Sequence, residues 1–222
     1  MREMGKVRDV LIHNGHPRAR VNARARRALR RAIALLDAHG EKFLGGCPAG
    51  ELSLVFLTGE ALAGLHGEFM GDASETDVIT FAAAAAAPPQ QQFTVHSSQF
   101  TVGADEHGRV EAGVPTACGL GAGDLCSEFR VQSSELAMAG EICVSVDAAA
   151  AFAKRHGREV AEELLLYVVH GWLHLAGYDD LQPARRRVMR GAERRAMGIL
   201  REAGVTGALC AQFKFGRVVR AV

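Results

Sequence analysis

The sequence has no apolar run long enough to cross a membrane and no apolar segment near its start. No stretch of 18 or more apolar residues occurs in the 222 residues. The chain begins Met-Arg-Glu-Met-Gly-Lys, which lacks the apolar core of a secretory signal. We therefore expect a soluble, cytoplasmic protein without a membrane partner.

Cysteines are few, and no two of them form a C-x-x-C pair. They are Cys47, Cys118, Cys126, Cys143 and Cys210. Five is an odd number and the spacing is irregular, which argues against a disulfide framework and favours a reducing compartment. We interpret Cys118 and Cys126 as free thiols rather than as metal ligands.

Lysine is also scarce, because 22 arginines and only 4 lysines carry the positive charge. The net charge is +1, so the placement of the arginines matters more than their sum. Arginine presents a planar fork that suits phosphate. Two clusters are candidate RNA-binding surfaces, although either could be only a solvated helix face. Their residues are Arg20, Arg24, Arg27, Arg31, Arg186 and Arg190.

The apolar content of 48% is that of a globular protein, and the residue patterns predict a mixed architecture. Predicted strands cover 7–13, 51–58, 76–81 and 140–146. Predicted helices cover 21–39, 60–69, 148–156, 158–176 and 183–202. Asp147 is the expected N-cap of the third helix, and Gly157 is expected to end it. Because strands and helices do not alternate strictly, we predict a single-domain α+β fold with a roughly four-stranded mixed sheet and packed helices.

Residues 82–137 differ in composition from the rest of the chain. They contain an alanine run, paired prolines, a glutamine run and a duplicated Gln-Phe-Thr-Val at 92–95 and 99–102. This composition predicts a low-complexity insertion, largely loop, with one hairpin formed by the repeated segments. Residues 204–222 form a basic tail to which no structure is assigned.

The strongest chemical motif lies at the end of the helix predicted over 158–176, which makes this helix the central one. His170 and His174 are four residues apart, so on a helix both imidazoles project from one face and can bind one ion. Gly177 is placed to end the helix in a left-handed conformation, after which the chain returns Asp180 toward the histidines. The pattern H-x-x-x-H-x-x-G-x-x-D offers two nitrogens and one carboxylate oxygen, with a fourth position open for water. That set is typical of a catalytic zinc site, whereas structural sites are usually closed by four protein ligands.

Two histidines on an apolar helix could instead be core residues bonded to the backbone. Gly177 and Asp180 in register favour the metal site, and we predict one Zn²⁺ ion held by His170, His174 and Asp180. Zinc lowers the pKa of bound water and polarises a carbonyl or phosphoryl oxygen, so hydrolysis is the predicted reaction.

The bond to be cleaved could be a peptide or a phosphodiester. Metzincin proteases share the spacing H-E-x-x-H-x-x-G-x-x-H, and the Glu after the first His is their general base. This chain has Gly171 at that position. The spacing is therefore protease-like, but the residue set is not.

Three ordered segments resemble the YbeY family of bacterial endoribonucleases. The segment from His170 to Asp180, His-Gly-Trp-Leu-His-Leu-Ala-Gly-Tyr-Asp-Asp, is similar to the family signature H-G-x-L-H-L-x-G-Y-D-H. Thr76-Asp77-Val-Ile-Thr-Phe81 resembles T-D-V-L-S-F-P, and Gly140-Glu141-Ile-Cys-Val-Ser145 resembles G-D-I-V-I-S. The likeness covers residues 7–81 and 138–203, and leaves out the insertion at 82–137 and the tail.

The resemblance implies a single α+β domain with a zinc-type site, made of 1–81 and 138–203. It also implies a role in maturation of the 3′ end of small-subunit rRNA and in ribosome quality control, with ribosomal RNA and the small subunit as partners. By position, His170, His174 and Asp180 match the family's metal ligands. The family usually has His as the third ligand, Arg where this chain has Met70, and Pro where it has Ala82.

Three functions follow from these residues. The first is a metal-dependent, single-strand-specific endoribonuclease, because sequence reading of RNA mostly uses unpaired bases. The second is a ribosome-assembly binding protein with a structural metal and little nuclease activity, which Met70 favours. The third is a metalloprotease, which Gly171 disfavours. Proximity to the motifs makes Asp77, Glu141 and Asp179 candidates for the general base, and no choice among them follows from the sequence.

Overall fold

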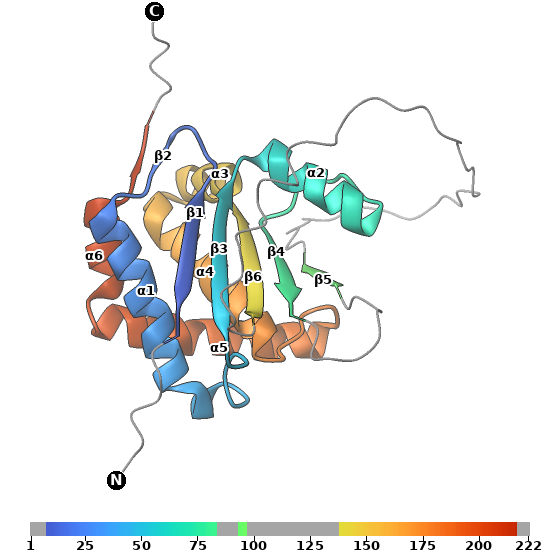
Figure 1. Ribbon diagram of the computed structural model, residues 1–222, viewed down its shortest axis with the longest axis vertical. Coiled ribbons are helices and arrows are strands. Elements are labelled where there is room, and N and C mark those ends of the chain that lie inside the picture. Colours follow the sequence, from blue (N-terminus) through green and yellow to red (C-terminus); the bar gives the residue numbers. More distant parts are fainter. Residues whose placement is uncertain (1–7, 84–92, 97–137, 217–222) are drawn as a thin grey trace, which may run out of the picture. The chain divides into compact units, whose positions relative to one another are not determined.

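A mixed β-sheet is the centre of the fold in the computed structural model, which describes residues 8–83, 93–96 and 138–216 (Figure 1). The strand order is β1-β3-β6-β4-β5. The strands are β1 (Val10–Asn14), β3 (Glu51–Leu57), β6 (Met138–Ser145), β4 (Val78–Ala82) and β5 (Phe93–His96). β1, β3 and β6 run parallel, whereas β4 is antiparallel to both β6 and β5. Short strands β2 (Ala19–Arg20) and β7 (Lys214–Phe215) pair separately.

Six α-helices of the described residues pack around this sheet. They are α1 (Ala23–Ala38), α2 (Gly59–Met70), α3 (Val146–His156), α4 (Val160–Leu175), α5 (Pro183–Glu202) and α6 (Val205–Gln212). A 3-10 turn, η1 (Gly40–Lys42), follows α1. None of these helices combines the length and the apolarity that a bilayer span requires.

The pleat of the strands gives each face of the sheet its own helices. Leu52, Leu54 and Phe56 of β3 alternate onto one face and pack in the main core with α1, α4, α5 and α6. Val55 points to the opposite face, where Leu62 of α2 belongs to a second, smaller cluster. The predicted α+β architecture is therefore confirmed, with the helix that bears the histidines in the main core.

The structure agrees with the predicted order of elements and adds β2, η1, α6 and β7, which the sequence analysis did not assign. The four predicted strands are β1, β3, β4 and β6, and the five predicted helices are α1 to α5. Strand β5 contains the first copy of the repeated Phe-Thr-Val, while the second copy and most of 82–137 lie outside the described residues. Within 204–216, α6 packs against α1 and α4, and β7 pairs with β2.

The N-cap predicted for α3 was wrong by two residues. Ser145 is the cap, because its side-chain oxygen accepts a hydrogen bond from the Ala148 N–H at 3.1 Å. Asp147 lies instead in the first turn of α3, where its carboxylate bonds to groups from distant segments. The predicted stop at Gly157 is confirmed, since this residue adopts the left-handed conformation with φ 65°.

Asp147 connects the segments that follow β1, β3 and β6. Its Oδ2 accepts from the Gly59 N–H at 3.0 Å, and its Oδ1 lies 3.1 Å from Nε2 of His16. Nδ1 of His16 accepts from two backbone N–H groups, those of Arg18 and Ala19, so Nε2 is the protonated nitrogen that donates to Asp147. Burial raises the pKa of Asp147, but the hydrogen bonds from Gly59, His16 and Arg18 outweigh it and place that pKa below the usual value.

Asp147→Asn is expected to lower the free energy of unfolding by about 1–2 kcal/mol near pH 7, because hydrogen bonds to a charged acceptor are lost. The effect is moderate because the carboxylate is 35% exposed and screened by solvent. A lowered native pKa stabilises the fold above the unfolded pKa of about 3.9, and this contribution is lost as the pH falls through the native value. Urea unfolding of both proteins from pH 7 to pH 3 should show the difference shrinking below about pH 4. A constant difference would refute this account.

Candidate metal centre

The apolar run predicted as a helix is α4, which is covered on nearly every side. Its buried residues include Leu164, Val168 and Trp172, each with no exposed area. Tyr167 is 7% exposed, so the side chains of both Trp172 and Tyr167 belong to the core. A helix with few solvated positions explains why the sequence shows a continuous apolar run rather than an amphipathic stripe.

Gly171 brings α4 close to the sheet beside the two histidines. A Cβ at this position would lie 2.5 Å from Cγ2 of Ile142 on β6 and 3.1 Å from Oγ1 of Thr80 on β4. Real Cβ atoms do not approach other atoms this closely. The backbone of α4 therefore rests directly on β6 and β4, which fixes the helix segment that bears His170 and His174.

The end of α4 turns the chain back toward the histidines. The Tyr178 N–H donates to the Leu173 carbonyl at 3.0 Å, and the Gly177 N–H donates to the His174 carbonyl at 2.9 Å. These two bonds form a Schellman motif, in which the residue after the cap adopts positive φ. Gly177 has φ 94°, a conformation that glycine adopts at little cost. The left-handed ending predicted at Gly177 is present.

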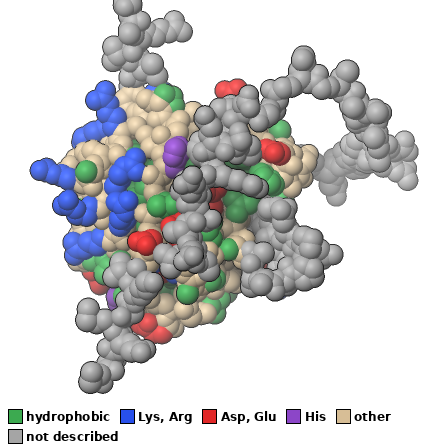
Figure 2. Space-filling view, in the orientation of Figure 1, with side chains coloured by type: hydrophobic (Ala, Val, Ile, Leu, Met, Phe, Trp, Pro, Cys, Tyr) green, Lys and Arg blue, Asp and Glu red, His purple; other side chains and the backbone are tan. Residues whose placement is uncertain are grey.

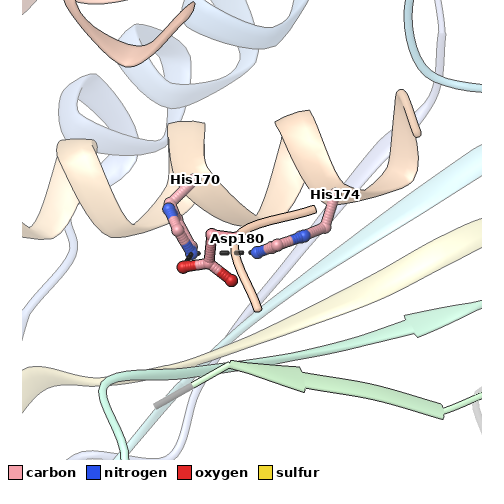
Figure 3. Close-up of side chains that lie close together, drawn as sticks. All are labelled: His170, His174 and Asp180. Carbon is pink, nitrogen blue, oxygen red and sulfur yellow. Dashed lines mark hydrogen bonds and ion pairs between the residues drawn. The ribbon is translucent and has the colours of Figure 1, made fainter. Parts of the chain in front are cut away.

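The turn brings the three predicted ligands together (Figure 3). Nε2 of His174 lies 2.9 Å from Nε2 of His170, and Nε2 of His170 lies 3.9 Å from Oδ2 of Asp180. One donor atom from each residue lies within 4.8 Å of the other two. His170 is 8% exposed and Asp180 is 9% exposed, so both of these donor residues are largely buried.

The outer nitrogens of both imidazoles are held by hydrogen bonds. Nδ1 of His174 lies 2.9 Å from the Tyr178 carbonyl, which can only accept, so this nitrogen carries the proton. Nδ1 of His170 lies 2.6 Å from Oε1 of Glu193, a carboxylate oxygen that accepts in the same way. In the neutral imidazoles both Nε2 atoms then carry lone pairs. Two lone pairs 2.9 Å apart repel each other unless a cation or a proton lies between them.

These residues fit a zinc ion by composition and by spacing. Bonds of about 2.0–2.2 Å to nitrogen and oxygen place two tetrahedral ligand atoms about 3.3–3.6 Å apart. The observed separations of 2.9 Å and 3.9 Å bracket that range. Metal-binding histidines usually donate their second N–H to a carboxylate or a carbonyl, and here one bonds to each.

Glu193 is the site residue that sequence reasoning missed. It lies on α5, 23 positions after His170, within a helix whose sequence suggested only packing and basic surface. α5 packs on α4 through Met189, Ala192 and Ala196, and this packing presents the Glu193 carboxylate to His170. The available signal was the single acidic residue among the arginines of 185–195.

Glu193→Gln is expected to weaken zinc binding by about 10–100-fold, because the amide holds the His170 ring less firmly and makes it a poorer ligand. Glu193→Ala should weaken it at least as much. Zinc affinity can be measured by competition with a chelator that changes colour on binding. Because Gln still accepts a hydrogen bond, a Gln variant weaker than the Ala variant would contradict this role.

Among the described residues, the group of donor atoms placed to hold a metal ion is His170, His174 and Asp180. Asp77, Glu141 and Asp179 are the candidates for the general base, and that role stays a prediction. Asp179 accepts from the Leu181 N–H at 2.8 Å and pairs with Arg185. The predicted RNA-binding arginines are all exposed, and Arg186 lies beside the site with its Nε donating to the Asp180 carbonyl at 3.1 Å.

The sequence matches a known protein family and several of its members. The family model described as Endoribonuclease YbeY matches residues 12–201. The Endoribonuclease YbeY of Kineococcus radiotolerans is 30% identical over 161 residues, covering 72% of this chain and 70% of that protein. The protein of the same name from Listeria welshimeri is 29% identical over 147 residues, covering 66% of this chain and 71% of its own.

A solved structure is also similar, the solution structure of TM1509 from Thermotoga maritima. It has a TM-score of 0.45 and 16% sequence identity, and the match covers 89% of this chain and 93% of the other. The family assignment comes from the sequence matches. The family model covers the positions of His170, His174 and Asp180. The chain belongs to the Endoribonuclease YbeY family.

Proposed function

We propose that the protein is a metal-dependent, single-strand-specific endoribonuclease that matures the 3′ end of small-subunit rRNA and acts in ribosome quality control. The observation that carries the proposal is the pair of Nε2 atoms of His170 and His174, which face each other beside the Asp180 carboxylate. A zinc ion bound there would supply Lewis-acid polarisation of a phosphoryl oxygen and a more acidic water. The proposed partners are ribosomal RNA and the small ribosomal subunit.

The burial of the donor residues supports single-stranded RNA as the substrate. His170 and Asp180 expose less than a tenth of their surface, so a phosphodiester must approach closely to reach their donor atoms. An extended single strand can present one phosphate in this way, whereas a duplex holds its phosphates on a broad rigid cylinder. Recognition of RNA through unpaired segments follows the same preference.

The chain's own residues would bind and orient the RNA. Asp180 and the two histidines would bind the metal ion, and Glu193 fixes the orientation of the His170 ring. Nε of Arg186 donates to the Asp180 carbonyl, and Arg186 is exposed. Its remaining N–H groups are therefore available to a phosphate next to the donor residues. Arg190, one turn further along α5, extends this contact.

An assembly factor with a structural metal is the second candidate function, and Met70 is the observation that favours it. Met70 occupies the position where the resemblance implies an arginine, and it ends α2 with 43% of its surface exposed. A cation to stabilise charge on the phosphate is therefore missing at that position. The three-donor site opposes this alternative, because a structural zinc usually has four protein ligands.

Cleavage of matched RNA substrates tests the proposal. Purified protein loaded with zinc should cut a single-stranded RNA internally, leave the duplex form of the same sequence intact and lose activity with a chelator. Cells that lack the protein should accumulate small-subunit rRNA with an unprocessed 3′ end. Ribosome association without cleavage under any metal condition would favour the assembly factor. Cleavage of unfolded protein instead of RNA would favour a protease.

A further inference from the structure

Positive side chains gather along the outer face of α1 and on the adjacent β2–β7 pair, on the side of Figure 2 where Lys and Arg gather. They are Arg20, Arg24, Arg27, Arg31 and Lys214, and we call this group the basic stripe. Arg24, Arg27 and Arg31 are spaced by three and four residues, which keeps them on one helix face, whereas Arg20 lies on β2 and Lys214 on β7. All five residues are exposed, and Lys214 is paired with Arg20 across strands β2 and β7.

Other arginines of the same helix have a structural role, which sets the stripe apart. The guanidinium of Arg26 donates to the Ile12 carbonyl, and Nε of Arg30 donates to the Val10 carbonyl at 3.1 Å. Both therefore attach α1 to β1. Within 8–83, 93–96 and 138–216, no hydrogen bond or ion pair engages the side chains of the basic stripe.

The placement of these charges does not favour the stability of the fold. α1 has no acidic residue in its first turn, and its single acid, Asp37, bonds to Arg8 and Trp172. Like charges at helix spacings of three and four cost about 0.2–0.5 kcal/mol per pair, and positive charges near a helix N-terminus oppose its dipole. Like charges directly opposite each other in a sheet, such as Arg20 and Lys214, also repel. A ligand that neutralises the stripe would remove these repulsions.

We propose that the basic stripe binds the phosphate backbone of RNA, independently of sequence and outside the metal centre. This inference rests on the proposed function, which makes RNA the polyanion that the protein meets. Arginine forks match phosphate oxygens, and residues 19–38 contain no aromatic side chain on which bases could stack. The stripe thus has groups for backbone binding and none for base recognition.

The position of the stripe extends the RNA footprint well beyond the cleavage site. α1 packs on β1, at one edge of the sheet, whereas α4 packs on β6 and β4. β1 and β4 are three strand positions apart, which is about 14–15 Å at the usual strand spacing. A backbone that contacts both regions must continue past the cut nucleotide. Because the stripe lacks stacking groups, it would bind the backbone of a duplex as well as that of a single strand.

Binding of RNA to an Arg24→Gln/Arg27→Gln variant, measured at several salt concentrations, tests the inference. The control is Lys154→Gln/Arg155→Gln, which removes the same charge from exposed positions in the last turn of α3. The probes are a fluorescent 30-nucleotide unstructured RNA and a duplex RNA of equal length, with chelator present so that cleavage does not interfere. Fluorescence anisotropy gives the affinity, and thermal unfolding confirms that each variant is folded.

The stripe variant is expected to bind both RNAs on the order of tenfold more weakly in 0.1 M salt. The slope of log K against log salt should fall by about 1.4 for the single strand and about 1.8 for the duplex, while the control keeps the wild-type slope. Equal slopes for the two variants would overturn the inference, even if the protein cleaves RNA. The inference would also be overturned if the stripe variant bound both RNAs like the wild type and lost only its binding to vesicles of anionic lipid. If the zinc-loaded protein cleaves no RNA while the stripe variant still shows the reduced salt slope, the proposed function is refuted and the stripe remains supported.

Discussion

His170→Ala is expected to lose stoichiometric zinc and to lower RNA cleavage by at least about 10³-fold, because several kcal/mol of charge stabilisation depend on the ion. The substitution removes one of the three donor atoms and leaves Glu193 without its imidazole partner. Metal analysis of the purified variant and single-turnover cleavage of an unstructured RNA measure the two effects. The fold should persist, because the main core is built from apolar residues of the sheet and helices and does not include His170.

Asp180→His is the matched control for that experiment. It keeps a donor at the third position and installs the residue that the family resemblance implies there, so zinc binding and cleavage should be retained. Asp180→Ala should behave like His170→Ala, since it leaves only the two imidazoles. Full activity of Asp180→Ala would show that the carboxylate is not a ligand. Full activity of His170→Ala would exclude the metal centre as the reacting site.

The clustering of His170, His174 and Asp180 could be predicted from the sequence because all three residues lie within 11 positions and local geometry brings them together. Helix periodicity places His170 beside His174, and the Gly177 turn determines where Asp180 arrives. Glu193 could not be predicted in the same way, because its approach depends on how α5 packs across α4. The hydrogen bond that places the proton on Nδ1 of His170 likewise depends on a tertiary contact, that with Glu193, whereas the partner of His174 Nδ1 is the Tyr178 carbonyl of the same local turn.

The elements of the fold were predictable for a similar reason, while their pairing was not. The strands over 51–58 and 140–146 show as short apolar runs, but nothing in either run indicates that they are parallel neighbours. Cap assignment at Asp147 was wrong because Ser145 and Asp147 are both good cap residues, and the carboxylate is bound by His16 and Gly59. α6 was missed because an eight-residue segment with mixed composition carries little periodic signal.

Gly171→Ala is expected to lower the free energy of unfolding by about 2 kcal/mol, although alanine favours helices by about 1 kcal/mol over glycine. The new methyl group would lie 2.5 Å from Ile142, whose side chain is fully buried, so α4 must move away from β6. Because His170 and His174 flank this contact, zinc affinity should fall together with stability. Denaturant unfolding and a chelator competition measure the two quantities.

Gly198→Ala is the control for this effect, since Gly198 lies within α5 and a Cβ there meets no atom within 4 Å. It should be neutral or stabilising by up to about 1 kcal/mol. A Gly171→Ala variant as stable as Gly198→Ala would contradict the close packing of α4 on the sheet. The same packing excludes the glutamate of the protease motif, because any side chain at 171 points into Ile142 and Thr80 rather than toward the metal ligands. For the proposed hydrolysis, the group that accepts a proton from water would therefore have to come from another position in this chain or from the RNA.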